Sequence, residues 1–559
     1  MAVSSFGLLD YLVLVGFLVL SSAIGIYFAW TDRAEQSNRT FLTANKQLGW
    51  LPVSLSLMAS FLSSNNILGF PAEVFVHGTT LWVGAVSSSV AILLATFAFL
   101  PIYYEMDVTS INEYLERRFK STAVRKLASF LFLLETLMYL GVVLYGPSLA
   151  LGSVTGIPVW SSILFNGLVC TFYTAIGGIK AVVWTDVVQM ILMYSGYVMV
   201  IISGLHHLGG FTNMWNLAEE GGRIIFLNLS PSVFETYTTW NVLLGLIVLW
   251  MSAYCATQTQ VQRYTSIGSL RGARKALLLN IPGVALLLLL SVLSGLILFA
   301  VYGKCDPRLK GDITKADQLM PYIVQDLLGD YPGLCGVLVA AVYSGCLSSL
   351  SSGFNAMAAV TWDDFIRPCV RLPEKRTVLL TKCIAAGYGL LSIAIAFVSG
   401  TFKSLVQAGN SLVGAMAGPL FSVFLLGFFF PCCKKKGVLA GMITGIAVSI
   451  WFTVGSSLHP KHNNFLPTST TGCTKFNESI SLGSFDGPQA PSGILMFYHI
   501  SFVWTSVIGF VATLPVALLV SLIFERNDEQ SVDPRYVCSF SRKFMKNGSK
   551  PDKLNLKVS

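Results

Sequence analysis

Two serine-rich stretches lie within otherwise apolar sequence and supply hard oxygen atoms. Residues 344–355 read SGCLSSLSSGFN, and Ser348 and Ser352 fall one helical turn apart. Residues 60–66 read SFLSSNN. Hydroxyl and carbonyl oxygens suit an alkali cation such as Na⁺, and neither stretch offers a thiolate or imidazole cluster for a transition metal. The pattern indicates a sodium site, although serines on a membrane helix also serve close helix packing, and that alternative stays open.

The polar residues 60–66 sit at the centre of a span, 49–76, that is long enough to cross a bilayer. Polar groups at that depth are costly unless they line a cavity or bind something. We therefore predict a helix that is broken at mid-membrane. Its free backbone carbonyls near Ala59 and Leu62, together with the serines, would replace the hydration shell of Na⁺.

A second span, 239–262, also turns polar partway, from Ser252 to Gln258. Each of these interrupted spans is the first of five consecutive predicted helices. Interrupted hydrophobic segments at corresponding places in two halves are typical of inverted-repeat transporters. The sequence therefore predicts two five-helix repeats, 49–208 and 239–430.

The composition indicates a polytopic membrane protein, because 54% of the 559 residues are hydrophobic and only 12% are charged. We expect an all-α fold with about thirteen transmembrane helices. Their approximate ranges are 8–30, 49–76, 79–104, 127–150, 158–178, 182–207, 239–262, 276–302, 332–360, 378–399, 404–430, 437–457 and 498–524. Residues 1–30 would add one helix before the repeats and 437–524 two after them, with 525–559 as a cytoplasmic tail.

The formal charge of +9 does not indicate nucleic acid, because the basic residues form no single patch. Loops rich in basic residues instead alternate along the chain with loops that are neutral or acidic, and in membrane proteins the cytoplasmic loops carry the excess Lys and Arg. The cationic set is Arg117, Arg118, Lys120, Arg125, Lys126, Lys180, Arg263, Arg271, Arg274, Lys275, Arg367, Arg371, Lys375, Arg376, Lys434, Lys435, Lys436, Arg542, Lys543 and Lys546. We therefore expect a plasma-membrane protein with its N-terminus outside and its C-terminus inside.

Other loop residues agree with this orientation. The sequons at Asn228 and Asn477 fall in predicted outside loops, where glycosylation is expected. Cys305 and Cys473 lie in outside loops and Cys335 near an outer helix end, so one disulfide is expected with its pairing left open.

Charged residues inside the predicted spans are the remaining candidates. An intramembrane carboxylate such as Asp186 is a functional candidate by default, and Asp186 could form an inner station for ion release. The alternative is an interfacial carboxylate that caps a helix start or pairs with Lys180. We expect Glu135 to bond a neighbouring helix, and we expect no buried arginine to be positioned to clamp the carboxylate of an anionic solute. No residue set indicates an enzyme.

Six motifs carry a resemblance to a known family. They are TSINEYLERRF (109–119), CTFYTAIGGIKAVVWTDVVQ (170–189), QVQRY (260–264), DQLMPYIVQDLL (317–328), YSGCLSSLSSGFNAMAAVTWDDFIRP (343–368) and AGPLF (417–421). With them the chain resembles the sodium/solute symporter family, which includes the sodium–glucose cotransporters, over about residues 8–525. FNAMAAVTWDDF and KAVVWTD are typical of its branch of iodide, monocarboxylate and multivitamin transporters.

The resemblance implies a leucine-transporter-like fold and Na⁺-driven import by alternating access. It implies a sodium site formed by Ala59, Leu62, Gly345, Ser348 and Ser349, and a second one formed by Ser63, Asn66 and Tyr145. It links Asp186, Gln189 and Ser351 to sodium handling and release. It implies a substrate cavity lined by Phe61, Ser63, Asn66, Tyr145, Trp250, Tyr254, Gln258 and Gln407.

We therefore predict a sodium-coupled symporter that imports a small organic anion, either a monocarboxylate or a vitamin such as biotin or pantothenate. Symport of iodide, another inorganic anion, a sugar or a polyol is the alternative within the class. Sugar is disfavoured because the sugar branch carries Asn in place of Phe61 and His in place of Asn66. A channel or a non-transporting sensor is the alternative of another class. The expected partners are the solute, sodium and the bilayer, with the chain as a monomer or a homodimer.

Overall fold

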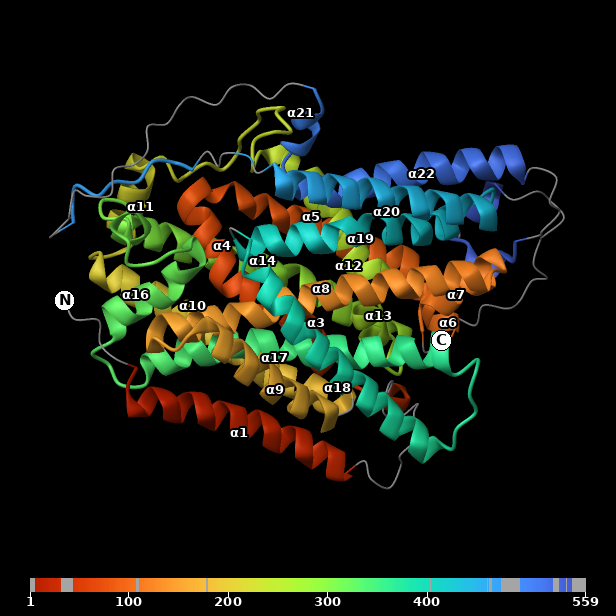
Figure 1. Cartoon of the computed structure of the whole chain (residues 1–559), viewed down its shortest axis with the longest axis horizontal. Coiled ribbons are helices and arrows are strands. Elements are labelled where there is room, and N and C mark those ends of the chain that lie inside the picture. The colour runs from red at the N-terminus through yellow and green to blue at the C-terminus, as the bar shows by residue number, and fades with distance from the viewer. Residues whose placement is uncertain are drawn as a thin grey trace.

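A computed structural model describes residues 6–31, 44–106, 110–176, 179–402, 404–459, 461, 465–473, 493–525, 532–538 and 540–544. All regular elements among these residues are helices. The helices run side by side along the long axis of a single bundle (Figure 1). The all-α architecture expected from the sequence is therefore confirmed.

The bundle is built from long helices that shorter ones connect. The long ones are α1 (Leu8–Thr31), α3 (Trp50–Phe61), α4 (Ser64–His77), α5 (Gly84–Leu94), α8 (Thr122–Thr155), α9 (Val159–Ile176), α10 (Ile179–His207), α12 (Leu246–Ala256), α14 (Leu270–Tyr302), α17 (Leu334–Val360), α18 (Glu374–Ser399), α19 (Leu405–Phe429), α20 (Lys435–Leu458) and α22 (Thr505–Phe524). The shorter ones are α6 (Leu100–Met106), α7 (Asn112–Phe119), α11 (Phe211–Glu220), α13 (Gln258–Thr265), α15 (Pro307–Lys310), α16 (Leu319–Leu328) and α21 (Ile494–Tyr498). Single turns of other helix types include η5 (Asn241–Gly245), η6 (Ala316–Gln318) and η7 (Thr361–Ile366).

Both predicted interruptions are present. α3 ends at Phe61 and α4 begins at Ser64, and the two helices are bent by 53° relative to each other. The intervening Leu62 and Ser63 leave the helical region, and Ser63 has extended backbone angles. The second span, η5 with α12, is bent by 48° relative to α13 at Thr257. The polar centres of the two spans thus mark the places where the backbone leaves the helix.

The number of spans comes close to the predicted thirteen. Among the described residues, ten helices are long and apolar enough to cross a membrane, and the two bent pairs raise this number to twelve. The predicted span 158–178 corresponds to α9 (Val159–Ile176), of which Val159–Phe172 is an apolar helical segment among the residues whose side chains are described.

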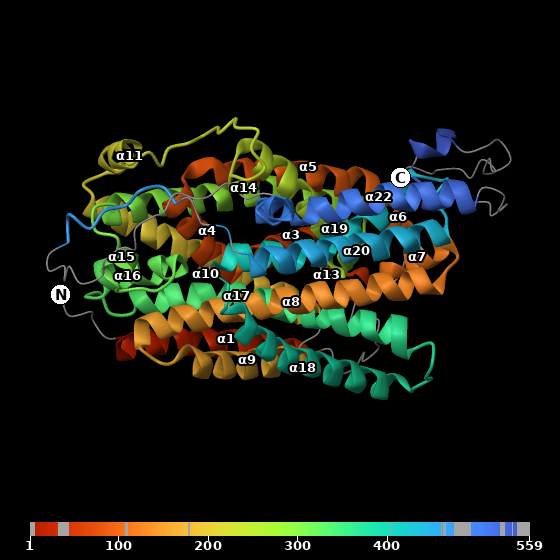
Figure 2. The same cartoon turned by 45° about the horizontal axis from the view of Figure 1, so that its top comes forward.

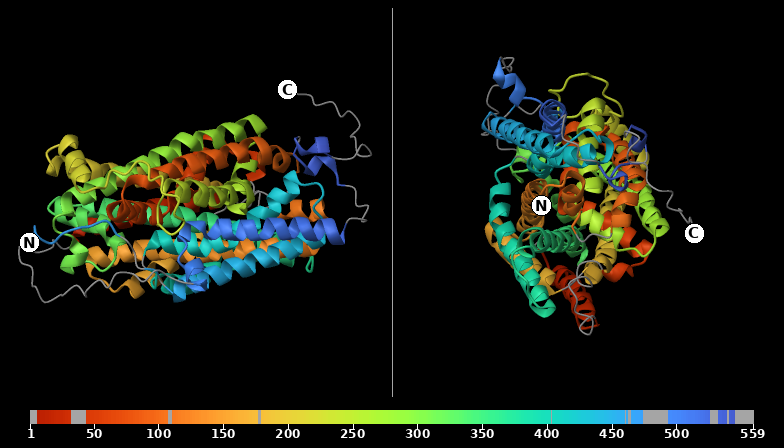
Figure 3. Two further views of the ribbon diagram at one scale, coloured as in Figure 1. Left: turned by 90° about the horizontal axis from the view of Figure 1, so that it is seen from above. Right: turned by 90° about the vertical axis from the view of Figure 1, so that its right-hand side faces the viewer.

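The two ends of the bundle differ in what they carry. α11, α15 and α16 gather at the end where α1 begins, which we call the α11 end (Figures 1 and 2). α7 and the described C-terminal segment around η9 (Pro534–Tyr536) lie at the opposite end, which we call the α7 end. α1 and the pair α20–α22 flank the bundle on opposite sides (Figure 3).

The pair α20–α22 packs through a ridge of glycines. A Cβ atom at Gly441 would lie 2.6 Å from the Thr513 carbonyl oxygen, and one at Gly445 would lie 2.9 Å from the Gly509 carbonyl oxygen. Small residues at every fourth position allow two membrane helices to approach each other closely. The last two long helices therefore pack closely together along one side of the bundle.

The loops of the α11 end are tied together by covalent and polar contacts. Cys305 is bonded to Cys473, with 5.0 Å between their Cα atoms, while Cys335 is free and buried. This settles the pairing that the sequence left open. Arg223, which follows α11, is fully buried and donates to the Phe75 carbonyl at 2.8 Å and to the Pro467 carbonyl at 2.9 Å. The loop around 466–473 is thus held against the end of α4.

Candidate functional site

The break between α3 and α4 leaves backbone carbonyls without the donors that a continuing helix would supply. The Ser60 and Phe61 carbonyls accept hydrogen bonds from side chains instead. The carbonyls of Ala59 and Leu62 accept none from the residues that the structure describes. Both residues are buried. Because neither carbonyl oxygen accepts a hydrogen bond from a described residue, both could bind a cation without first losing one.

α17 approaches this break at Gly345. A Cβ atom there would lie 2.7 Å from the Leu62 carbonyl oxygen and 2.9 Å from the Ser63 carbonyl carbon. Only glycine allows this approach without displacing the chain. One turn further along α17, Ser349 Oγ lies 3.0 Å from the Gly345 carbonyl oxygen, and the buried Ser348 hydroxyl has no hydrogen-bond partner among the described residues. The predicted sodium ligands thus lie on facing segments of α3 and α17.

Arg263 on α13 lies inside the bundle, not in a cytoplasmic loop as the sequence indicated. Its side chain is 2% exposed, and Nη2 lies 3.4 Å from Asp186 Oδ2. Nη1 donates to the Ser56 carbonyl at 2.7 Å, and the guanidinium also contacts the Ser60 and Ser352 hydroxyls. The sequence therefore misplaced Arg263, because α13 resumes after Thr257 and carries Arg263 back into the bundle, where its charged partner is Asp186.

Asp186 on α10 is fully buried, so the alternative of an interfacial carboxylate is wrong. Oδ2 accepts a hydrogen bond from Ser56 Oγ at 2.6 Å, and the cationic partner is Arg263 rather than Lys180. Oδ1 has no partner among the described residues, and neither has the side-chain amide of the buried Gln189. Ser351 Oγ donates to the Ser348 carbonyl at 3.2 Å, which connects this group of polar residues to the sodium ligands.

A cavity of about 200 Å³ lies beside the break. Phe61, Ser63, Asn66, Trp250 and Ser349 are among the residues that line it. The Phe61 ring lies 5.1 Å from that of Trp250 and 4.6 Å from that of Tyr254, between centroids. An apolar wall with a few polar groups is the usual form of a small-molecule site.

Four predicted substrate residues do not line this cavity. Tyr254 lies behind Phe61 and is fully buried. Gln258 is also fully buried, and its Oε1 accepts a hydrogen bond from the Ile111 amide at 2.9 Å. Tyr145 lies under the Lys315 ammonium, 5.1 Å from nitrogen to ring centroid. The fourth, Gln407, lies in the first turn of α19.

The residues predicted for a second sodium site are not all together. Ser63 and Asn66 both line the cavity, and the Asn66 carbonyl accepts a hydrogen bond from the Tyr197 hydroxyl at 2.8 Å. Tyr145 packs instead against Gly400, since a Cβ atom on that glycine would lie 3.1 Å from the tyrosine ring. The structure thus groups two of the three residues.

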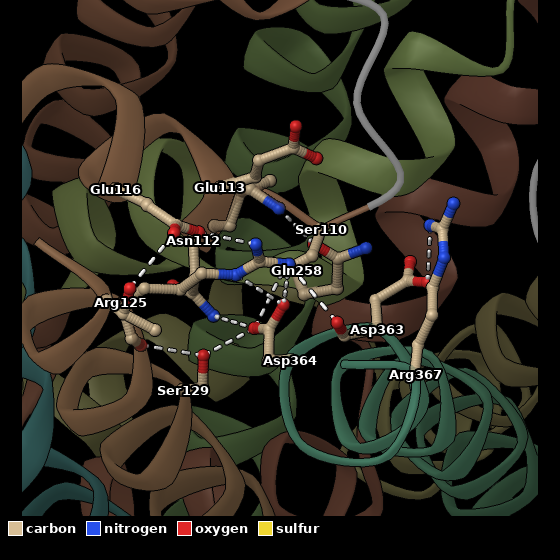
Figure 4. Close-up of polar contacts among 12 residues, drawn as sticks. Ser110, Asn112, Glu113, Glu116, Arg125, Ser129, Gln258, Asp363, Asp364 and Arg367 are labelled. Carbon is tan, nitrogen blue, oxygen red and sulfur yellow. Dashed lines mark hydrogen bonds and ion pairs between the residues drawn. The ribbon is translucent and has the colours of Figure 1, made fainter. Parts of the chain in front are cut away.

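A polar network centred on Asp364 joins several elements at the α7 end (Figure 4). Asp364 is 2% exposed, and its Oδ1 accepts a hydrogen bond from Arg125 Nε at 2.9 Å. Oδ2 accepts one from Ser110 Oγ at 2.9 Å and another from Ser129. Arg125 also binds Glu116 at 2.7 Å, and this hydrogen bond lowers the pKa of Glu116. The network therefore fastens η7 to α8 and to the segment at the start of α7, and the sequence placed Ser110, Glu116, Arg125 and Asp364, but not Ser129, outside the predicted spans.

One residue that lines the cavity was misjudged from the sequence. Glu135 on α8 faces the cavity, makes no hydrogen bond to any described residue and is 5% exposed. The expectation that it bonds a neighbouring helix is therefore wrong. Its spacing from Tyr139, one turn away and also lining the cavity, could have placed it on the same face of α8.

A helix break with unbonded carbonyls, beside a cavity in a polytopic helical bundle, is the arrangement of an ion-coupled membrane transporter. The model of the family described as "Sodium:solute symporter family" matches residues 41–445, and the chain belongs to that family.

Known relatives match nearly the whole chain. It is 38% identical over 555 residues to the human "Sodium-coupled monocarboxylate transporter 1", covering 96% of this chain and 90% of that protein. It is 37% identical over 543 residues to the human "Sodium/iodide cotransporter", covering 93% and 84% respectively. The solved structure of a Na⁺-coupled sialic acid symporter superposes with a TM-score of 0.77 at 22% identity, covering 93% of this chain and 98% of that one.

These similarities confirm the leucine-transporter-like fold and the class of activity. The protein is a multi-pass membrane transporter that couples the movement of a small solute to the co-transport of sodium. Its family and its relatives are transporters.

Proposed function

We propose that the protein is a plasma-membrane symporter, not an enzyme, that imports a small monocarboxylate together with Na⁺. The unbonded carbonyls of Ala59 and Leu62 carry the proposal, together with the close approach of Gly345 on α17 to the Leu62 carbonyl oxygen. Sodium bound there would hold α3 against α17 and stabilise the cavity wall at Phe61. The solute would then enter a preformed site.

The cavity supports a small, partly apolar solute. Its volume of about 200 Å³ and its Phe61 and Trp250 walls suit a short carbon chain. The amides of Asn65 and Asn66 and the hydroxyl of Ser63 could donate hydrogen bonds to a carboxylate. The similarity to monocarboxylate transporters favours this solute class over the vitamins.

Uptake of labelled solutes with and without external Na⁺ tests this function. We expect lactate or nicotinate to accumulate uphill only with Na⁺, whereas iodide, biotin, pantothenate, choline and hexoses compete weakly or not at all. If iodide were the only solute that accumulated, the transported solute would be an inorganic anion and not an organic one. Currents or signalling without uphill accumulation would indicate the channel or sensor.

Replacing both Ser348 and Ser349 by alanine tests the sodium site. We expect Na⁺-dependent uptake to be lost while the protein still reaches the cell surface, because two cation ligands are removed and no charge is left unpaired. The matched control is Ser457→Ala, since the Ser457 hydroxyl is exposed and bonds only the preceding turn of α20. Unchanged uptake by the double variant would refute the site.

The second ion site and the release path are proposals of the same kind. Ser63 and Asn66 could bind a second Na⁺ within the cavity, and Tyr145 would join them only after α8 moves. Asp186, Gln189 and Ser351 could receive the ion on its way to the cytoplasm. The unbonded atoms of Asp186 and Gln189 support such a role.

We also propose that the α11 end is extracellular and the α7 end cytoplasmic. The Cys305–Cys473 bond supports this, because disulfides persist outside the cell. Asn228, in the loop after α11, is the glycosylation site to test with a glycosidase; Asn477 lies outside the described residues. Exposed apolar side chains on α1 and α22, such as Leu12 and Ile523, would face the bilayer, and the two repeats would be 49–208 and 239–430. The chain would act as a monomer or a homodimer.

A further inference from the structure

The cavity contains a single carboxylate and no basic side chain. Among the described residues that line it, Glu135 is the only acid, and no arginine, lysine or histidine is present. The Glu135 side chain is buried and makes no hydrogen bond and no ion pair with a described residue. A carboxylate in such a place is strongly disfavoured in its ionised form.

Two arginines inside the bundle are engaged in ion pairs away from the cavity. Arg263 on α13 binds Asp186 on α10, and Arg125 at the start of α8 binds Asp364 of η7. Neither arginine lines the cavity.

The remaining titratable groups around α8 do not compensate Glu135 either. Tyr139 on α8 and Tyr237 are the only other titratable residues that line the cavity. None of the other titratable residues described on the helices packed against α8 lines the cavity; these are Glu73 and His77 of α4, Glu113, Tyr114, Glu116, Arg117 and Arg118 of α7, Cys170 of α9, Tyr322 and Asp326 of α16, Asp317 of η6, Cys335, Tyr343 and Cys346 of α17, Glu374, Lys375, Arg376, Lys382, Cys383 and Tyr388 of α18, Asp363 and Asp364 of η7, and Lys435 and Lys436 of α20.

We propose that Glu135 is a proton-binding site of the transport cavity and that its protonated form is the one that admits an anionic solute. A proton from water joins one carboxylate oxygen, and the neutral carboxyl then offers an O–H donor where the ionised group would repel the anion. This deepens the proposed import of a monocarboxylate and rests on it. It also explains how a cavity without any fixed cation can accept a negative solute.

Uptake at several external pH values tests the site, with Glu135→Gln as the neutral mimic. In the wild type we expect Na⁺-dependent uptake to fall about tenfold as the pH rises from about 6 to about 8.5. The Glu135→Gln variant should transport at both pH values with at most about a twofold difference. Glu219→Gln, which changes an exposed carboxylate of α11, is the control and should keep the wild-type profile. A Glu135→Gln profile that superimposes on the wild-type profile would overturn the proposal.

A second measurement does not depend on any variant. Dicyclohexylcarbodiimide reacts with protonated carboxyl groups in apolar surroundings and leaves a stable acylurea that mass spectrometry locates. In the purified wild type, Glu135 should be labelled at about pH 6 and much less at about pH 9, and Na⁺ with solute should protect it. No label on Glu135 at the lower pH, in protein that stays monodisperse, would contradict the proposal.

The outcomes separate this inference from the function on which it rests. If the wild type imports no monocarboxylate but Glu135 is labelled as expected, the solute class is wrong and the proton site stands. If monocarboxylates are imported and Glu135 is neither labelled nor responsible for the pH profile, the proton site is wrong. Uptake of an organic amine that Glu135→Gln abolishes would show that the carboxylate works in its ionised form, and this too would overturn the proposal.

Discussion

At Gly345 a Cβ atom would lie only 2.7 Å from the Leu62 carbonyl oxygen, which is too close for any other residue. We expect Gly345→Ala to push α17 away from the break, with an overpacking cost of about 1–3 kcal/mol. The sodium concentration for half-maximal uptake should rise about tenfold or more. Gly387→Ala on α18 is the matched control, because a Cβ there meets nothing within 4 Å. Equal sodium dependence in both variants would contradict the role of Gly345.

The pair Arg263–Asp186 allows a second prediction about single residues. Removing one partner of a buried ion pair costs about 3–5 kcal/mol, because it leaves the other charge uncompensated. Arg263→Gln should therefore unfold at a clearly lower temperature in detergent. Adding Asp186→Asn should restore much of the loss, since the stranded carboxylate is then removed.

The exposed pair Arg535–Asp533 provides the comparison for this experiment. The Arg535 side chain is 78% exposed, so Arg535→Gln should leave the unfolding temperature unchanged. If the double variant at Arg263 and Asp186 were less stable than Arg263→Gln alone, the ion-pair explanation would fail.

Among whole elements, the network of Asp364 links η7, α7 and α8 at the α7 end (Figure 4). Asp364→Asn weakens several hydrogen bonds to a charged group, each worth about 1.5–3 kcal/mol. We expect a lower unfolding temperature and a lower maximal uptake rate, with the sodium dependence little changed. Thermal unfolding and uptake at saturating Na⁺ measure the two effects.

The adjacent Asp363 offers a matched control. Its side chain pairs with Arg367 at 3.4 Å, and the Arg367 side chain is 67% exposed. Asp363→Asn should therefore have a smaller effect on both measurements than Asp364→Asn. Effects of equal size would mean that the loss reflects charge at this end of the bundle and not the specific network.

The helix breaks could be predicted from the sequence because polar residues at mid-span have few physical explanations in lipid. The partners of those residues could not, because they come from distant helices. Arg263 shows the difference: eight residues of α13 follow the break, and only the bend of 48° decides that the guanidinium points inward. Glu135 could be placed in a span, but a cavity on one face of α8 is a property of the packed bundle.

At the scale of the whole molecule, the disulfide Cys305–Cys473 joins segments that are 168 residues apart in the sequence. A bond of this kind typically contributes about 2–4 kcal/mol to stability. Cys305→Ser, Cys473→Ser and the double variant should therefore lose the same amount, as measured by thermal unfolding. Reductant should lower the unfolding temperature of the wild type to that of the variants. Cys383→Ser, at an exposed free cysteine, is the control, and an additive loss in the double variant would contradict the bond.

The position of Arg263 has a consequence for the efficiency of the transporter. Its guanidinium sits on α13 and touches α3 at Ser56 and Ser60, so it connects the half-helices of both interrupted spans. A movement of one broken span relative to the other would have to break these hydrogen bonds. Uncoupled leak, in which Na⁺ crosses without the solute and its gradient is dissipated, would therefore require these buried hydrogen bonds to break.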